Sequence, residues 1–191
     1  MPIQVGQRVA HRFDQPLGLL SDCHRRIEHF LEVLVKVTND AAGRALTADY
    51  RTALEGAVRY FAVAAPKHTA DEEISLFPRL RASGDPNIAE ALSALDKLER
   101  DHEEADQHHA SVDTLVRRWL ENDRLAPSEV AELQDHLGRL QTLYHEHIAI
   151  EDRQVFPAAA GALGPAEIAA VGAEMAARRG VQPPNLRTSP E

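Results

Sequence analysis

Apolar residues recur along this chain at intervals of three and four, the spacing of one face of an α-helix rather than the alternation of a strand. Turn residues divide the pattern into four long segments, at about residues 16–39, 47–83, 86–122 and 128–156. Pro16 and Pro86 suit first helical positions, whereas Pro66 should kink the second segment. A shorter alanine-rich segment follows at about 165–179. The pattern therefore predicts an all-α protein, an up-down-up-down four-helix bundle with a short additional C-terminal helix.

Length and composition favour one acidic domain. With 191 residues, the chain has the length of a single domain with a proper core. We expect an N-terminal arm at residues 1–13, the bundle at 14–160, and the short helix with a flexible tail at 161–191. The net charge of −9, without a dense basic run, disfavours nucleic acid and anionic membranes as partners. No signal core or membrane-length apolar segment occurs in the sequence, so we expect a cytoplasmic protein.

One motif occurs twice. The sequence from His68 to Pro78, which reads His-x-x-x-Glu-Glu-x-x-Leu-Phe-Pro, recurs from His147 to Pro157 as His-x-x-x-Glu-Asp-x-x-Val-Phe-Pro. His24 precedes the first copy by 44 positions, and His102 precedes the second by 45. Each half of the chain is therefore predicted to form a hairpin of one helix with a single histidine and one with the motif. Two such hairpins, related by a pseudo-twofold axis, would close the bundle.

The positions of these residues on their helices indicate a metal site. They fall on the apolar stripes, so both motif carboxylates should point into the core, where an uncompensated charge costs several kcal/mol. A histidine and a glutamate four residues apart lie on one helix face and can share a metal ion. Four imidazoles and two carboxylates are too few for two isolated metals, but suffice if the carboxylates bridge and an oxo or hydroxo group completes the pair. The predicted ligands are His24, His68, Glu72, His102, His147 and Glu151.

The donor types narrow the choice of metal. Cys23 is the only cysteine, which excludes an intrachain disulfide and a thiolate cluster. Imidazole suits zinc, copper, iron and nickel, whereas calcium and magnesium prefer shells of oxygen. A dinuclear, carboxylate-bridged site inside a bundle favours iron, with manganese or zinc as the next candidates.

These residues resemble, in order and spacing over residues 14–160, the ligand series of the hemerythrin-like (HHE cation-binding) family. The resemblance implies a four-helix bundle that holds a non-heme di-iron centre, with the four histidines as terminal ligands and the two glutamates as bridges. Oxygen-carrying hemerythrins have a fifth histidine four residues after the third-helix ligand, where this chain has Asp106. Asp106 is expected to bind metal, to hydrogen-bond a ligand, or to face solvent. The set of four histidines and two glutamates is more similar to the di-iron domain of proteins that repair iron centres after nitrosative stress, although residues 1–14 are too short for the cysteine-bearing domain that precedes it there.

The other histidines, Glu73 and Asp152 are not predicted to be primary metal ligands. His109 lies one stripe period beyond His102 and is expected to support the site rather than bind metal. His29, His108 and His145 are predicted to be solvated or structural. Glu73 and Asp152 are expected at the surface or behind the ligands, with Asp152 a reserve ligand if the fourth helix bulges.

The sequence is compatible with three functions. The first is a di-iron protein that binds or senses a small diatomic molecule or oxidant such as oxygen or nitric oxide. The second is a di-iron redox enzyme or iron donor in oxidative or nitrosative stress and iron-centre repair. The third is a bundle whose metal is purely structural.

Overall fold

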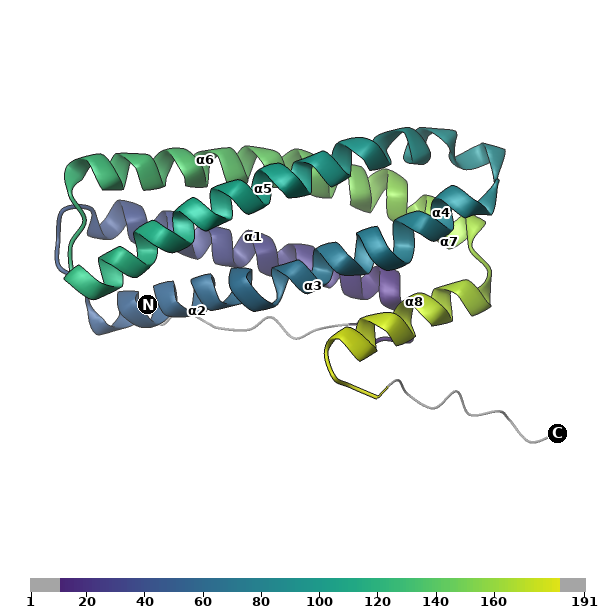
Figure 1. Ribbon diagram of the computed structural model, residues 1–191, viewed down its shortest axis with the longest axis horizontal. Coiled ribbons are helices and arrows are strands. Elements are labelled where there is room, and N and C mark those ends of the chain that lie inside the picture. Colours follow the sequence, from purple (N-terminus) through teal and green to yellow (C-terminus); the bar gives the residue numbers. More distant parts are fainter. Residues whose placement is uncertain (1–10, 183–191) are drawn as a thin grey trace.

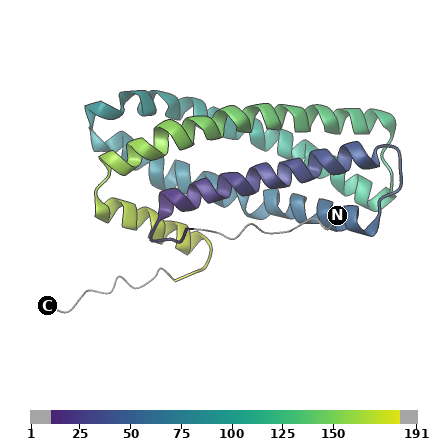
Figure 2. The same cartoon turned by 180° about the vertical axis from the view of Figure 1, so that it is seen from behind.

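The protein is a bundle of four antiparallel helical rods with a short helix packed beside it, as a computed structural model describes it for residues 11–182 (Figures 1 and 2). The first rod is α1 (Pro16–Ala41), and the second joins α2 (Ala48–Val63), α3 (Ala65–Ala70), the π-helical η1 (Asp71–Leu76) and α4 (Phe77–Ser83). After the 3₁₀ turn η2 (Pro86–Ile88), the third rod is α5 (Ala89–Asn122). The fourth joins α6 (Pro127–Ile150), the π-helical η3 (Glu151–Val155) and α7 (Phe156–Ala162), and α8 (Pro165–Arg178) follows. The predicted all-α up-down-up-down bundle with an additional C-terminal helix is confirmed.

Local signals in the sequence set several helix ends. The Thr47 side chain accepts a hydrogen bond from the Tyr50 backbone N–H at the start of α2, and the Asp85 side chain caps η2 in the same way. Gly84 ends α4 with φ of 66°, a left-handed conformation that glycine adopts without a steric penalty. The expected kink at Pro66 appears as the break between α2 and α3.

The Phe-Pro pairs do not end their helices, in contrast to the prediction that the fourth helix stops at about residue 156. Pro78 and Pro157 instead occupy the first turns of α4 and α7. The N–H group that proline lacks would have no helical partner in a first turn, so its absence costs no hydrogen bond. The helical path therefore continues past each motif to Ser83 and to Ala162.

The core consists of two apolar clusters with a polar layer between them. One cluster fills the end of the bundle near the loops after α1 and α5, and includes Ile27, Phe61 and Ala105. The other fills the end near α4, α7 and α8, and includes Leu20, Leu76 and Leu98. Along every rod, the predicted metal ligands lie between residues of the first cluster and residues of the second.

Helix α8 closes the second cluster against the motif of the second rod. Met175 is completely buried, and Arg79 forms a bidentate ion pair with Glu174, at 2.7 and 3.1 Å. Asp71, also completely buried, lies 2.7 Å from both Arg178 Nη1 and Arg179 Nη2. Residues 1–10 of the predicted arm at 1–13, and residues 183–191 of the predicted tail, lie outside the described residues.

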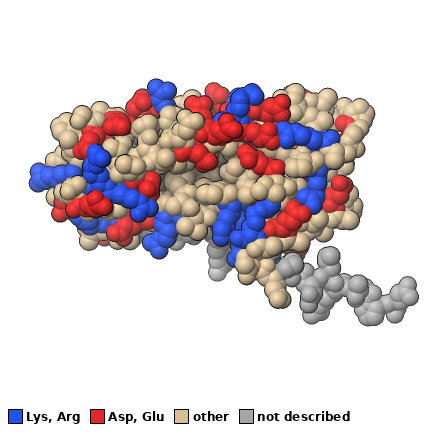
Figure 3. Space-filling view, viewed as in Figure 1, with Lys and Arg blue, Asp and Glu red and all other residues tan. Residues whose placement is uncertain are grey.

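On the face shown in Figure 3, acidic side chains gather over α5. None of the helices within residues 11–182 combines the length and the apolar character needed to cross a membrane.

Candidate metal centre

Each of the four rods contributes to one buried cluster of histidine and glutamate side chains. α1 carries the first histidine and α5 the third, while the second and fourth rods each carry a histidine and a glutamate. All six side chains are buried, and both glutamates have no exposed surface. The structure thus brings together the whole predicted set: His24, His68, Glu72, His102, His147 and Glu151.

The six side chains form two overlapping groups of four. His24 and His68 belong to one group, His102 and His147 to the other, and Glu72 and Glu151 belong to both. Within each group, one donor atom from every residue lies within 4.8 Å of the others. Two metal positions that share both carboxylates are the arrangement expected of a carboxylate-bridged dinuclear site.

The contacts within the cluster converge on common centres. The Nε2 atom of His24 lies 3.0 Å from Glu151 Oε2, and that of His147 lies 3.2 Å from the same oxygen. The two oxygens of Glu72 face different histidines, with Oε1 3.3 Å from His68 Nε2 and Oε2 3.4 Å from His102 Nε2. These close contacts lack hydrogen-bond geometry, and all four carboxylate oxygens are buried without a hydrogen-bond partner among the described residues. Buried carboxylates left in this way need a cation, so the donor set fits a metal pair.

A π-helical turn follows the histidine in both copies of the motif. The Phe77 N–H donates to the carbonyl of Glu72, and the Phe156 N–H donates to the carbonyl of Glu151, five residues back in each case. The proline that follows each phenylalanine cannot make the ordinary bond to the residue four before it, which favours the wider turn. Glu151 thus begins one π turn and Glu72 is the second residue of the other, and such turns are common at functional sites.

Carboxylates lie behind three of the four imidazoles. Glu73 Oε1 lies 2.8 Å from His102 Nδ1, and Asp152 Oδ1 lies 3.2 Å from His24 Nδ1. These two carboxylates occupy equivalent positions in the two copies of the motif, and each contacts the single histidine of the opposite hairpin. Such contacts fix which imidazole nitrogen faces the metal.

The pseudo-twofold symmetry does not extend to the imidazole of His68, which has no carboxylate behind it in the described part of the chain. Neither His147 Nδ1 nor His68 Nδ1 has a hydrogen-bond partner among residues 11–182, but Asp101 Oδ2 lies 3.5 Å from His147 Nδ1 in an ion-pair contact that His68 lacks. The position equivalent to Asp101 holds Cys23, whose sulfur accepts a hydrogen bond from Arg26 at 3.2 Å. The sequence analysis did not identify Asp101. The available signal was its position directly before the predicted ligand His102, where the other half of the chain has Cys23 before His24.

The surrounding carboxylates change the pKa values of the imidazoles. Burial alone would lower the pKa of His24, but Asp152 and Glu151 hold it well above its ordinary value. Burial opposes the shift at His147 too, where Glu151 and Asp101 raise the pKa to about 9.

The carboxylates in turn remain ionised. Burial would raise the pKa of Glu72 and Glu151, but the histidines around them hold both below the ordinary value. His68 is different, since burial outweighs Glu72 and lowers its pKa to about 4. The cluster is therefore a focus of negative charge with neutral or proton-bearing imidazoles around it, and a metal would compete with those protons.

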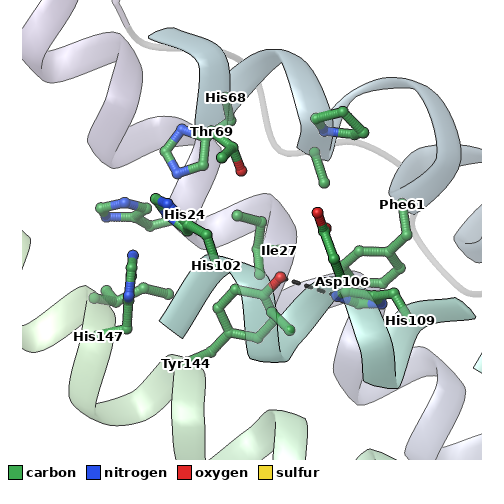
Figure 4. A pocket seen from close by; sticks show the side chains of 14 residues that line it. His24, Ile27, Phe61, His68, Thr69, His102, Asp106, His109, Tyr144 and His147 are labelled. Atoms are coloured by element: carbon green, nitrogen blue, oxygen red, sulfur yellow. Dashed lines mark hydrogen bonds between the residues drawn. The ribbon is translucent and has the colours of Figure 1, made fainter. Parts of the chain in front are cut away.

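A narrow cavity of about 30 Å³ adjoins the cluster on the side of the first apolar cluster, and the exposed residues Pro66 and Asp106 are among those that line it. The four histidines line one side, and Phe61, His109 and Tyr144 are among the residues that line the other (Figure 4). Space of this size holds about one or two water-sized molecules. The arrangement therefore leaves room for a small guest beside the donors.

His109 and Asp106, the two further candidates from the sequence, both line this cavity. Burial lowers the pKa of His109 to about 4, so its imidazole is neutral, and a hydrogen bond of 2.9 Å joins its Nε2 to the Tyr144 hydroxyl (Figure 4). Asp106 also lines the cavity, but its side chain is largely exposed and belongs to neither group of donors. Asp152, the reserve ligand, belongs to neither group even though the fourth rod does form a π turn.

The other histidines lie apart from the cluster. His145 is exposed, as expected, and His29 is half-buried against the ring of Phe30. His108 differs from its predicted solvation, because it is half-buried and its Nδ1 lies 2.9 Å from that of His136 on α6.

Comparison with known proteins agrees with this geometry. A protein of Haemophilus influenzae (strain ATCC 51907 / DSM 11121 / KW20 / Rd) described as uncharacterized is 25% identical over 172 residues, which is 89% of this chain and 93% of that protein. The sequence model of the hemerythrin HHE cation-binding domain matches residues 15–159, the four rods and all six clustered donors. The match and the buried clusters together indicate a metal-binding protein. This chain belongs to the hemerythrin HHE cation-binding domain family.

Proposed function

We propose that this protein binds two iron ions in the buried cluster and uses them to bind or sense a small diatomic molecule or oxidant, such as oxygen or nitric oxide. The observation that carries the proposal is the pair of overlapping donor groups that share Glu72 and Glu151. His24 and His68 would hold one ion, and His102 and His147 the other.

The chemistry of the donors supports iron. All of them offer nitrogen or oxygen, and the one cysteine, Cys23, accepts a hydrogen bond from Arg26 instead of joining the cluster. Imidazole and carboxylate together suit iron, with manganese and zinc as competitors, and disfavour calcium and magnesium. When bound, a di-iron centre supplies redox chemistry and open coordination positions for a small ligand.

The residues around the cluster suit a small, uncharged ligand. The cavity beside the histidines is narrow and lined by apolar side chains together with imidazoles, and it leaves space for a diatomic molecule. Tyr144 and His109 present a hydrogen-bonded pair at its wall, which can orient a polar end of that ligand. With Asp106 where a fifth imidazole would stand, two ions would have fewer protein ligands than in an oxygen carrier.

Metal analysis with a visible spectrum tests this function. Full-length protein purified aerobically from iron-replete cells should contain about two irons per chain, one for each donor group. Its near-ultraviolet charge-transfer absorption should change reversibly under argon and under nitric oxide. Stoichiometric zinc without that absorption would contradict the proposal. Catalytic consumption of peroxide or nitric oxide would favour the enzyme over the binding protein.

Substitution of the shared carboxylates tests the dinuclear arrangement. Glu72→Ala and Glu151→Ala should lower metal content and thermal stability together, since metal binding is coupled to folding. Glu146→Ala is the matched control, because this glutamate is exposed on α6 and directly precedes the predicted ligand His147. Unchanged metal content in both core variants would exclude the shared-carboxylate assignment.

A further inference from the structure

A second cavity lies beyond the wall of the first. It has a volume of about 220 Å³ and lies among α1, α2 and α5, with apolar side chains such as Leu34, Val58 and Val112 lining most of it. Ala62 and Ala110 also line it and are exposed, so this outer chamber meets the surface at the seam between α2 and α5. The seam faces the viewer in Figure 1.

The outer chamber and the inner cavity have two lining residues in common, Phe61 and His109. Their rings are stacked, with centroids 4.2 Å apart and an angle of 27° between the planes. His109 is held from the inner side by its hydrogen bond to Tyr144. A layer of two aromatic rings therefore separates the outer chamber from the space beside the donors, and Figure 4 shows both rings from the side of the donors.

We propose that small uncharged molecules reach the metal centre through this two-chambered passage, with the stacked pair of Phe61 and His109 as its gate. The inference rests on the proposed function only for the identity of the guest. Rotation of the Phe61 side chain opens the wall at the cost of the ring contact, about 1 kcal/mol, and of the apolar area that the ring buries there, while His109 stays held by Tyr144. Side-chain rotation of this kind does not require the bundle to open.

The charges along the passage select against anions. The Asp113 Oδ2 atom accepts a hydrogen bond from Arg117, whereas its Oδ1 atom is buried without a hydrogen-bond partner among the described residues and belongs to a side chain that lines the outer chamber. Acidic side chains also gather over α5 on the face shown in Figure 3. A neutral diatomic passes these carboxylates without repulsion, while an anion such as azide meets like charge.

Xenon tests the passage without any metal. Crystals of the metal-free full-length protein under xenon pressure should show xenon in the outer chamber, and Phe61→Leu should extend its density into the inner cavity. Absence of xenon from the outer chamber would overturn the proposal. Because the xenon experiment needs no metal, it tests whether the passage exists even if the protein proves to bind no iron.

Ligand kinetics test the route. Ala110 is exposed at the mouth, so Ala110→Trp covers the passage without disturbing the core; Ala131→Trp, at an exposed alanine on α6, is the matched control. In the iron-loaded protein, Ala110→Trp should slow nitric oxide association severalfold and Phe61→Leu should speed it, at unchanged iron content. The wild type should bind nitric oxide faster than azide, and Asp113→Asn should narrow that difference. Equal nitric oxide rates in the Ala110→Trp, Ala131→Trp and wild-type proteins would overturn the proposal.

Discussion

The carboxylates behind His102 and His24 provide a test of the two separate metal positions. Glu73→Ala removes the acceptor that lies 2.8 Å from His102 Nδ1, and Asp152→Ala removes the one 3.2 Å from His24 Nδ1. Because each contact orients a different histidine, each substitution should weaken one metal position and spare the other. The control is Glu103→Ala, which changes an exposed glutamate next to His102.

The size of the effect follows from the exposure of these contacts. Loss of a carboxylate behind a histidine ligand lowers metal affinity by about 10- to 100-fold. The Glu73 side chain is 34% exposed, so solvent screens its charge and we expect the lower end, about tenfold or about 1.4 kcal/mol. Glu73→Gln keeps an acceptor but loses the charge, and should therefore have a smaller effect. Asp152 also accepts a hydrogen bond from the Ser21 hydroxyl at 2.7 Å, which positions it and makes a similar loss reasonable.

Competition titrations with Co²⁺ and a chelator measure the two stepwise affinities of the metal-free protein. Each single variant should weaken one step, and the Glu73→Ala/Asp152→Ala double variant should weaken both. If both substitutions acted on one position, the double variant would instead weaken a single step twice. Affinities equal to those of Glu103→Ala would refute the reasoning.

Two further predictions concern pH and packing. Because the pKa of His147 is raised to about 9, the metal-free protein should lose stability from about pH 6.5 to 9 as that imidazole gives up its proton, whereas the loaded protein should lose metal as the pH falls below about 6. Melting temperatures and metal content across pH check this, and parallel profiles for the two forms would contradict it. Gly172→Ala would place its Cβ 1.9 Å from the Phe13 carbonyl oxygen and should destabilise the protein by about 1–3 kcal/mol, whereas Gly56→Ala, with open space around it, should stabilise it by about 0.5–1 kcal/mol. Urea unfolding of both variants measures the difference, and equal effects would contradict the packing argument.

The bundle followed from the sequence because its signals are local and repeated. The spacing of apolar residues and the turn residues between segments identified every rod, since each long helix buries one continuous stripe. The predicted fourth helix ends at about residue 156, because Pro157 interrupts the ordinary hydrogen bond, whereas the predicted second helix runs past Pro78 to residue 83. The structure uses each of them just after a wide turn, where the missing donor carries no penalty, and that choice depends on backbone bonds that no periodicity reveals.

The grouping of the six donors was also predictable, because a histidine or a glutamate on a buried stripe needs a partner. Their assignment as metal ligands remains a prediction. The partners on the far side of the imidazoles were less accessible to sequence reasoning. Asp101 lies off the apolar stripe of α5 and touches His147 only because α5 and α6 pack side by side, so its role depends on tertiary packing. The outer chamber likewise arises where three helices meet, and no single stripe contains it.

The differences between the two halves bear on function more than their similarity does. The repeat supplies matched donors, yet His147 has Asp101 behind it while His68 has no such partner, and their pKa values move in opposite directions, to about 9 and about 4. A carboxylate behind an imidazole increases its basicity and its donation to a metal. The position held by His102 and His147 therefore has carboxylates behind both imidazoles, and the position held by His24 and His68 has one. Two ions in this cluster would differ in electron richness, so the position of His24 and His68 should be the one that more readily takes an electron.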